Sequence, residues 1–297
     1  MTMLRIILFI IGLLSSSSVF SQETESLLYL KQELLFREPI LKKDYKLHGL
    51  VKSLKITTNH YENNFVSYQN LYFSKEGFLT KSEYYTNLDK KHIVVTVYNY
   101  QNSKLMYLVE SNGTGKKVFY YDNMNRLIKE ISYGKYNENK DEVENIKEFV
   151  YNSKNQIIKT IDYDKVSEFI YDTSDRFTQI KYFYVSDPDE IFTDKFNYQD
   201  NKNHSYSSVS MKNGVIISRD RYKSNYDEKN NITDLETETE GMPLKVEKNV
   251  YMYDSQDNIS KKETYHNDKK ISLQIYSINY YTSDSVEDEN LQEVIFN

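Results

Sequence analysis

The chain has no cysteine, and this absence excludes several kinds of chemistry. Disulfide bonds, thiolate metal sites, thiol catalysis and a lipid-modified amino-terminal cysteine all require a thiol. An exported domain below about 80 residues usually needs disulfides, whereas 297 residues are enough to rely on the burial of apolar surface. We therefore expect a fold that is held by packing and hydrogen bonds alone.

Glycine and arginine are also scarce. Among only eight glycines there is no glycine-rich phosphate-binding loop, and no G-x-S-x-G motif marks a nucleophilic serine. The formal net charge is −6, six residues are arginine, and the lysines are spread along the chain rather than clustered. Proteins that bind nucleic acid usually carry a basic patch, so we expect no nucleic-acid partner.

Titratable residues form no recognisable catalytic or metal-binding pattern. The histidines are scattered, at His48, His60, His92, His204 and His266. A metal site needs three or four converging ligands, and no acidic run has the order of an EF-hand loop. With 44 acidic residues, spacing alone does not identify a carboxylate pair for glycoside hydrolysis. We expect no enzyme activity, no catalytic residue, no metal and no cofactor.

Residues 1–21 have the features of a secretory signal peptide. Arg5 provides a positive start and Ile6–Leu14 is an apolar run, and we expect cleavage between Ser21 and Gln22. The alternative is an uncleaved membrane anchor, but nine apolar residues fall short of the roughly 20 that span a bilayer. The sequence therefore predicts an exported protein, periplasmic or extracellular, with no transmembrane segment after cleavage.

Residues 22–46 are expected to form a short amino-terminal helix and a linker. The segment Glu23–Arg37 carries leucines near helical spacing, and Pro39 ends the pattern. We expect this helix to pack on one end of a sheet and to cover an edge strand. The alternative is a helix that binds a partner. At the other end of the chain, residues 283–297 form an acidic tail.

A tyrosine-anchored motif that recurs between Phe73 and Tyr265 is the strongest signal in the chain. Its clearest copies read YDNMNRLIKEISY, YNSKNQIIKTIDY and YDSQDNISKKETY, and they begin at Tyr121, Tyr151 and Tyr253. An aromatic or apolar residue usually stands two positions before the anchor, which places both on one face of a β-strand. A repeat of this kind predicts stacked β-hairpins. The anchors are Phe73, Tyr100, Tyr121, Tyr151, Tyr171, Tyr198, Tyr226 and Tyr253.

In the best copies the anchor is followed by the residues of a tight turn, whereas Tyr100 and Tyr198 lead poorer copies. The residue after the anchor accepts backbone hydrogen bonds that start a turn; it is Asp122, Asn152, Asp172, Asp227 or Asp254. The residue four positions after the anchor is one that enters the left-handed backbone region at low cost. It is Gly77, Asn125, Asn155, Asp175, Asn230 or Asp257. These two offsets predict a hairpin loop in every well-formed copy.

The return strand of each hairpin alternates between two kinds of residue. Strict alternation places Leu127, Lys129, Ile131 and Tyr133 on one face, with Ser132 on the other. We therefore expect an aliphatic and tyrosine-rich face and a wet face of Ser, Thr, Asp and Glu, as in an antiparallel sheet. The recurrent lysines are expected to lie across neighbouring tyrosine rings.

These hairpins predict an all-β fold over residues 47–282. A single hairpin is marginal in water, so we expect about 16 to 18 strands to form one long antiparallel meander. A sheet of that size has to curl, and we expect it to be strongly twisted or rolled. A propeller is the alternative, in which two repeats would pair to make one four-stranded blade.

The motif Y-D-x-x-[GND]-[RN]-[LI]-x-K-x-x-x-Y resembles the YD repeat of the RHS family of bacterial surface and toxin-shell proteins. Leu47–Ser53 is similar to the opening strand of short secreted YD-repeat proteins that are common in Bacteroidetes. The resemblance covers roughly residues 47–280, and it implies a sheet that winds as a spiral or shell. The chain departs from the large members in having no long array, no autoproteolytic block and no carboxy-terminal toxin module.

Three insertions interrupt the repeat, at Gly134–Lys147, Val185–Lys195 and Leu235–Asn249. Loops on a rigid scaffold often carry recognition, so a ligand would be sought here first; the alternative is that they are solvated linkers. We expect an exported, non-catalytic repeat scaffold that binds an unidentified protein or glycan at the cell envelope or outside the cell. One alternative is a component of an RHS-type contact-toxin or immunity system. The other is a cryptic carboxylate-dependent hydrolase.

Overall fold

The computed structural model describes residues 45–88, 93–110, 115–134, 143–199, 202–229 and 231–281. The expected signal peptide (1–21), the helix predicted for Glu23–Arg37 and the acidic tail (283–297) lie outside the described residues. What is described is all β, as predicted, and forms one 18-stranded antiparallel sheet. Over the same ranges no helix is long and apolar enough to cross a membrane.

The strands follow one another with short connections. In chain order they are β1 (Val51–His60), β2 (Phe65–Phe73), β3 (Leu79–Thr86), β4 (Val94–Gln101), β5 (Lys104–Glu110), β6 (Gly115–Tyr121), β7 (Leu127–Tyr133), β8 (Val143–Tyr151), β9 (Ile157–Asp162), β10 (Lys165–Tyr171), β11 (Phe177–Tyr184), β12 (Asp187–Gln199), β13 (Lys202–Lys212), β14 (Val215–Tyr226), β15 (Ile232–Thr239), β16 (Lys245–Tyr253), β17 (Ile259–His266) and β18 (Lys269–Tyr280). Each pairs with the next in an antiparallel register, so the predicted hairpins and the predicted number of strands are present.

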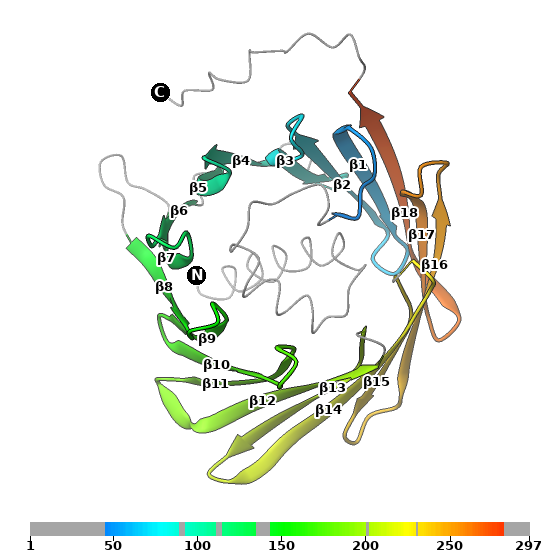
Figure 1. Ribbon diagram of the computed structural model, residues 1–297. Helices are drawn as coiled ribbons and strands as arrows, with labels where there is room; N and C mark the ends of the chain where they lie inside the picture. Colours follow the sequence, from blue (N-terminus) through cyan, green and yellow to red (C-terminus); the bar gives the residue numbers. More distant parts are fainter. Residues whose placement is uncertain are drawn as a thin grey trace.

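The sheet closes on itself into a barrel, so the expected twisted or rolled meander is wrong. β1 pairs with β18 along nearly its whole length, for example Ile56 opposite Tyr276. Figure 1 shows the resulting ring, with blue β1 beside red-brown β18. Closure gives both edge strands a hydrogen-bonding partner, which is how barrels avoid exposed edges. A barrel of this strand number is wide enough that porins of similar size enclose an aqueous channel.

The meander places its connections alternately at the two ends of the barrel. The end with the short anchor-associated turns is called the turn rim here, and the opposite end the loop rim. All three insertions belong to the loop rim, but they are mainly strand where they are described. Val185–Lys195 mostly extends β12, which has 13 residues, and Leu235–Asn249 is divided between β15, β16 and a turn at 240–244. In Gly134–Lys147, positions 135–142 lie outside the described residues.

A β-bulge shortly after each described turn of the turn rim reverses the alternation of the return strand. Tyr121 pairs with Leu127 but Tyr120 pairs with Lys129, so Ile128 is an extra, unpaired residue. The expected common face of Leu127, Lys129, Ile131 and Tyr133 is therefore wrong. Leu127 shares its face with Glu130 and Ser132 instead. The equivalent extra residues are Thr80, Met106, Ile158, Thr178, Thr233 and Ser260.

The inner face of the barrel has two belts of different chemistry. Nearer the turn rim lies the apolar belt, made of two buried clusters that include Leu71, Phe119 and Ile180, with the anchor tyrosines packed against them. Beyond the bulges the same face becomes polar. This polar belt contains the buried residues Thr58, Ser67, Thr96, Glu130, Thr160, Ser167, Asp194, Ser210, Asn249, Lys262, Thr264 and Gln274. The residues predicted to form the wet face thus lie inside, on the face that carries the core.

Candidate functional site

The turn rim is built as the sequence predicts. Asp122 Oδ1 accepts hydrogen bonds from the backbone N–H groups of Met124 and Arg126, both at 2.9 Å. Asn152, Asp172, Asp227 and Asp254 accept equivalent pairs. The left-handed corner is also confirmed wherever it is described. Positive φ angles occur at Gly77, Asn125, Asn155, Asp175 and Asp257, while Asn230 lies outside the described residues.

Several anchor tyrosines bind one turn to the next around the barrel. Tyr151 Oη donates to the backbone oxygen of Leu127, the first residue after the preceding turn, at 2.7 Å. Tyr121 and Tyr171 make the same contact with Leu105 and Ile157. The described cations that stack on anchor rings come from the turns or, for Lys104, from the first residue of the following strand. They are Lys104, Arg126, Arg176 and Lys229, whereas of the lysines predicted for this role only Lys81 has a described ring contact, with Tyr72.

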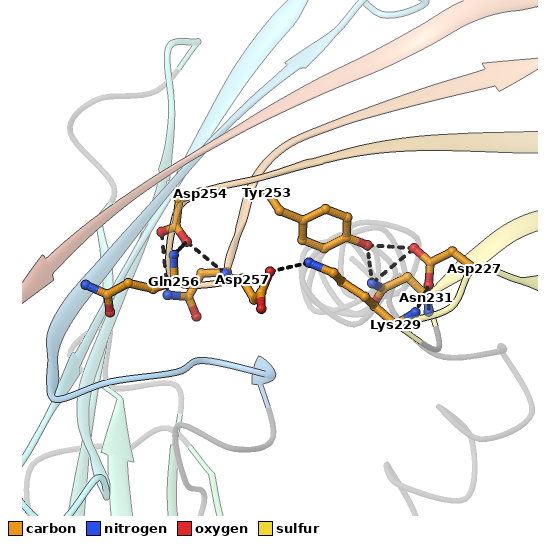
Figure 2. Close-up of polar contacts among 8 residues, drawn as sticks. Asp227, Lys229, Asn231, Tyr253, Asp254, Gln256 and Asp257 are labelled. Carbon is orange, nitrogen blue, oxygen red and sulfur yellow. Dashed lines mark hydrogen bonds and ion pairs between the residues drawn. The ribbon is translucent and has the colours of Figure 1, made fainter.

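Figure 2 shows the polar contacts that turn-rim residues make with one another. Tyr253 Oη donates to Asp227 Oδ2 at 2.6 Å and accepts from Asn231 Nδ2 at 2.6 Å. Lys229 Nζ lies 3.9 Å from the centre of the Tyr253 ring and 2.5 Å from Asp257 Oδ1. Burial and the neighbouring Asp227 carboxylate raise the pKa of Tyr253. Because these groups bind one another, we interpret the rim as structural.

The polar belt, by contrast, combines satisfied and unsatisfied groups. Lys117 Nζ lies 2.8 Å from Glu130 Oε1, and Thr264 Oγ1 donates to Asn249 Oδ1 at 3.0 Å. Lys262 is almost completely buried, and burial lowers its pKa to about 8, against the opposing effect of Glu247. The belt therefore includes strongly desolvated groups, which are concentrated at functional sites more often than elsewhere.

One part of the polar belt contains buried polar atoms with no hydrogen-bond partner. Thr160 Oγ1, Ser167 Oγ and Asp194 Oδ1 are all in this state. Thr160 and Ser167 are each 1% exposed, and Asp194 is 8% exposed. Native proteins pair nearly all such atoms, so each exception calls for an explanation, such as a missing ligand or water.

The strand register brings these atoms together with two aromatic rings. Thr160 lies opposite Ser167, Ser167 opposite Tyr182, and Tyr182 opposite Phe192. Asp194 follows Phe192 by two residues, so it lies on the same face of β12. The rings of Tyr182 and Phe192 stack with centres 4.7 Å apart. We call Thr160, Ser167, Tyr182, Phe192 and Asp194 the β9–β12 patch.

Two charged groups define the electrostatics of the patch. Burial raises the pKa of the Asp194 carboxyl, while a hydrogen bond with Ser208 and the charge of Lys165 act in the opposite direction. Lys165 Nζ lies 4.5 Å from the centre of the Tyr182 ring. The lysine therefore sits over the aromatic platform and is electrostatically coupled to the buried carboxyl at the same time.

The insertion Val185–Lys195 contributes Phe192 and Asp194 to the patch, although as part of a strand rather than a loop. Thr160 was missed because strict alternation assigns it to the wet face. Ser167 lies two residues before Phe169, so alternation places it on the inner face, but no motif marks it. The available signal is the adjacent apolar pairs Leu127–Ile128 and Ile157–Ile158, which break the alternation where the bulge occurs.

The histidines whose side chains the structure describes do not converge on a metal site. His60 lies on the inner face, where its Nε2 is 3.0 Å from Ser67 Oγ and burial lowers its pKa. Nothing is described for the side chains of His92 and His204. Among the residues that the structure describes, no group of three or more His, Cys, Asp or Glu could hold a metal ion.

Comparison with known proteins yields only distant similarities. No family model matches the chain, and no curated protein matches it. A porin-like protein from Bacteroides uniformis is similar at a TM-score of 0.42 and 10% identity, over 77% of this chain and 98% of that one. A porin-like protein from Bacteroides vulgatus is similar at 0.38 and 12%, over 78% and 100%. The TcdB2-TccC3 structure is similar at 0.27 and 8%, over 84% of this chain and 17% of that one. At these values the similarities establish no shared function.

Proposed function

We propose that this protein is an exported, non-catalytic barrel that binds a protein or a glycan through its inner face. The observation that carries the proposal is the set of buried, unpartnered polar atoms in the β9–β12 patch. Leaving a buried hydroxyl or carboxylate oxygen unsatisfied costs about 1–3 kcal/mol per group. A ligand that supplies the missing partners recovers that energy on binding, which makes the patch a natural recognition site.

We place the barrel at the envelope or outside the cell, and its outer face carries charged side chains among exposed apolar ones such as Val150 and Ile170. Lys159, Glu168 and Lys181 lie opposite one another in neighbouring strands, on the face away from the core. A charged side chain at the middle of a lipid-facing strand costs about 2–4 kcal/mol for Lys or Arg. This row of alternating charge favours water around strands β9 to β11, and the predicted signal peptide agrees with a periplasmic or extracellular location.

Two arginine substitutions, one on each face of the sheet, test whether binding occurs inside the barrel. Ser167→Arg places a long cation on the inner face, and Thr193→Arg places it on the outer face of β12. We expect the inner variant of the exported protein to lose its retention on immobilised glycans or envelope proteins, while the outer variant keeps it. Retention by both variants would place the binding surface outside.

The same preparation separates the alternative functions. If incubation releases shorter sugars from a retained glycan, the carboxylate-dependent hydrolase is favoured over a binding protein. Retention of a toxin or immunity component, with no glycan retained, would favour the contact-toxin alternative. Amino-terminal sequencing of the exported protein should begin near Gln22, and a start at Met1 would contradict the export prediction.

A further inference from the structure

We infer that the β9–β12 patch binds a neutral, extended oligosaccharide by stacking on Tyr182 and by hydrogen bonding to Thr160, Ser167 and Asp194. This inference rests on the proposed function and specifies its ligand. It begins from two features that lie side by side on one face, a stacked aromatic pair and three buried oxygens without partners.

The spacing of the oxygens requires an extended ligand. They lie on β9, β10 and β12, and neighbouring strands are about 4.8 Å apart, so the row spans roughly 14 Å across the sheet. A single ion or small anion cannot reach oxygens distributed over that length. Tyr182 lies between Ser167 and Phe192 in the register, and Asp194 lies two residues along β12 from Phe192. A chain-like ligand would therefore cross the face of the Tyr182 ring on its way between the polar groups.

The chemistry of the groups favours a neutral, hydroxyl-rich ligand over a charged one. Ser and Thr hydroxyls both donate and accept hydrogen bonds, while an ionised carboxylate only accepts. Sugar hydroxyls complement both types, and the apolar face of a sugar ring packs on an aromatic side chain. An anionic ligand would face the carboxylate of Asp194.

A ligand can replace the contact between Lys165 and the Tyr182 ring. The Lys165 ammonium lies over this ring, and its charge already acts on Asp194. A sugar ring that stacks on Tyr182 would displace this ammonium, which can then move toward the carboxylate. The ring and Phe192 are only half-buried, and Tyr184 beside them is 39% exposed, so the aromatic end of the patch is the accessible one.

The test uses isothermal titration calorimetry of the exported full-length chain with cellohexaose, maltohexaose, xylohexaose and chitohexaose. We expect at least one of these to bind, and we expect Ser167→Ala, Tyr182→Leu and Asp194→Asn each to weaken it about tenfold, as for the loss of one buried contact. Outward-facing substitutions of the same types are the matched controls, and they should leave affinity within about twofold. They are Thr193→Ala, Tyr120→Leu and Asp234→Asn.

Each result has a defined consequence, provided that far-ultraviolet circular dichroism shows all six variants to be folded. If an oligosaccharide binds but the three inner variants match their controls, the site is elsewhere and the inference is overturned. If none of the four binds while Ser167→Arg still abolishes retention of an envelope protein, the inference fails and the proposed function stands. If neither sugars nor envelope proteins bind, both fail.

Discussion

The buried Lys262 allows a sharp test of the polar interior. Its pKa is lowered from 10.5 to about 8, first by burial, and each pKa unit corresponds to about 1.4 kcal/mol of differential stabilisation. Keeping the ammonium charged inside the barrel therefore costs about 3 kcal/mol at neutral pH. Lys262→Met keeps a side chain of similar length without the charge, so we expect the variant to be more stable at pH 7 by up to about 3 kcal/mol.

The pH dependence distinguishes this cause from simple repacking. Between pH 8 and 10.5 the folded protein has released the proton of Lys262 while the unfolded chain still binds it, so the free energy of unfolding of the parent protein rises with pH. The advantage of Lys262→Met should shrink across the same window. Urea unfolding from pH 7 to 10.5, followed by circular dichroism, measures this difference. Lys261→Met on the outer face is the control, and a constant difference or a less stable Lys262→Met variant at pH 7 would refute the reasoning.

Three further predictions concern the turn rim and the patch. Tyr151→Phe removes the hydrogen bond to Leu127, so urea unfolding should show a loss of about 1 kcal/mol, whereas the outward Tyr120→Phe should show none. Asn155→Val forces a β-branched residue into a positive φ of 63° and should cost about 1–2 kcal/mol, whereas Asn155→Gly should be tolerated; equal losses would contradict the left-handed corner. Burial raises the pKa of Asp194, so the parent protein should lose stability as pH rises above 3.8 through the folded pKa. Asp194→Asn should lack this loss in urea titrations, and parallel slopes would argue against a raised pKa.

The turn chemistry could be predicted because it is local. Asp122 and Asn125 lie within four residues of their anchor, and each acts through hydrogen bonds or backbone angles that a few neighbouring residues determine. The row of anchor tyrosines could be predicted for the same reason, since the motif repeats the anchor at each hairpin. These features give the hairpins and the approximate number of strands.

The composition of the interior could not be predicted from alternation. A single extra residue such as Ile158 moves every later side chain of its strand to the other face. Thr160 then lies inside and Lys159 outside, the reverse of the expected assignment. The contribution of β9 to the β9–β12 patch depends on this reversal, because without it the Thr160 hydroxyl would face away from Ser167.

The repeating hairpin can be derived from the sequence alone, because turn residues, anchor tyrosines and strand alternation all act over short distances. Closure of the sheet cannot, since Ile56 and Tyr276 meet from opposite ends of the repeat and neither strand carries a local mark of its partner. The tertiary structure also decided which groups face the lumen, because the bulges and the closed register together select one face of the sheet as the interior. The candidate site depends on the bulges and on strand pairing between distant segments, which is why its residues carry no motif.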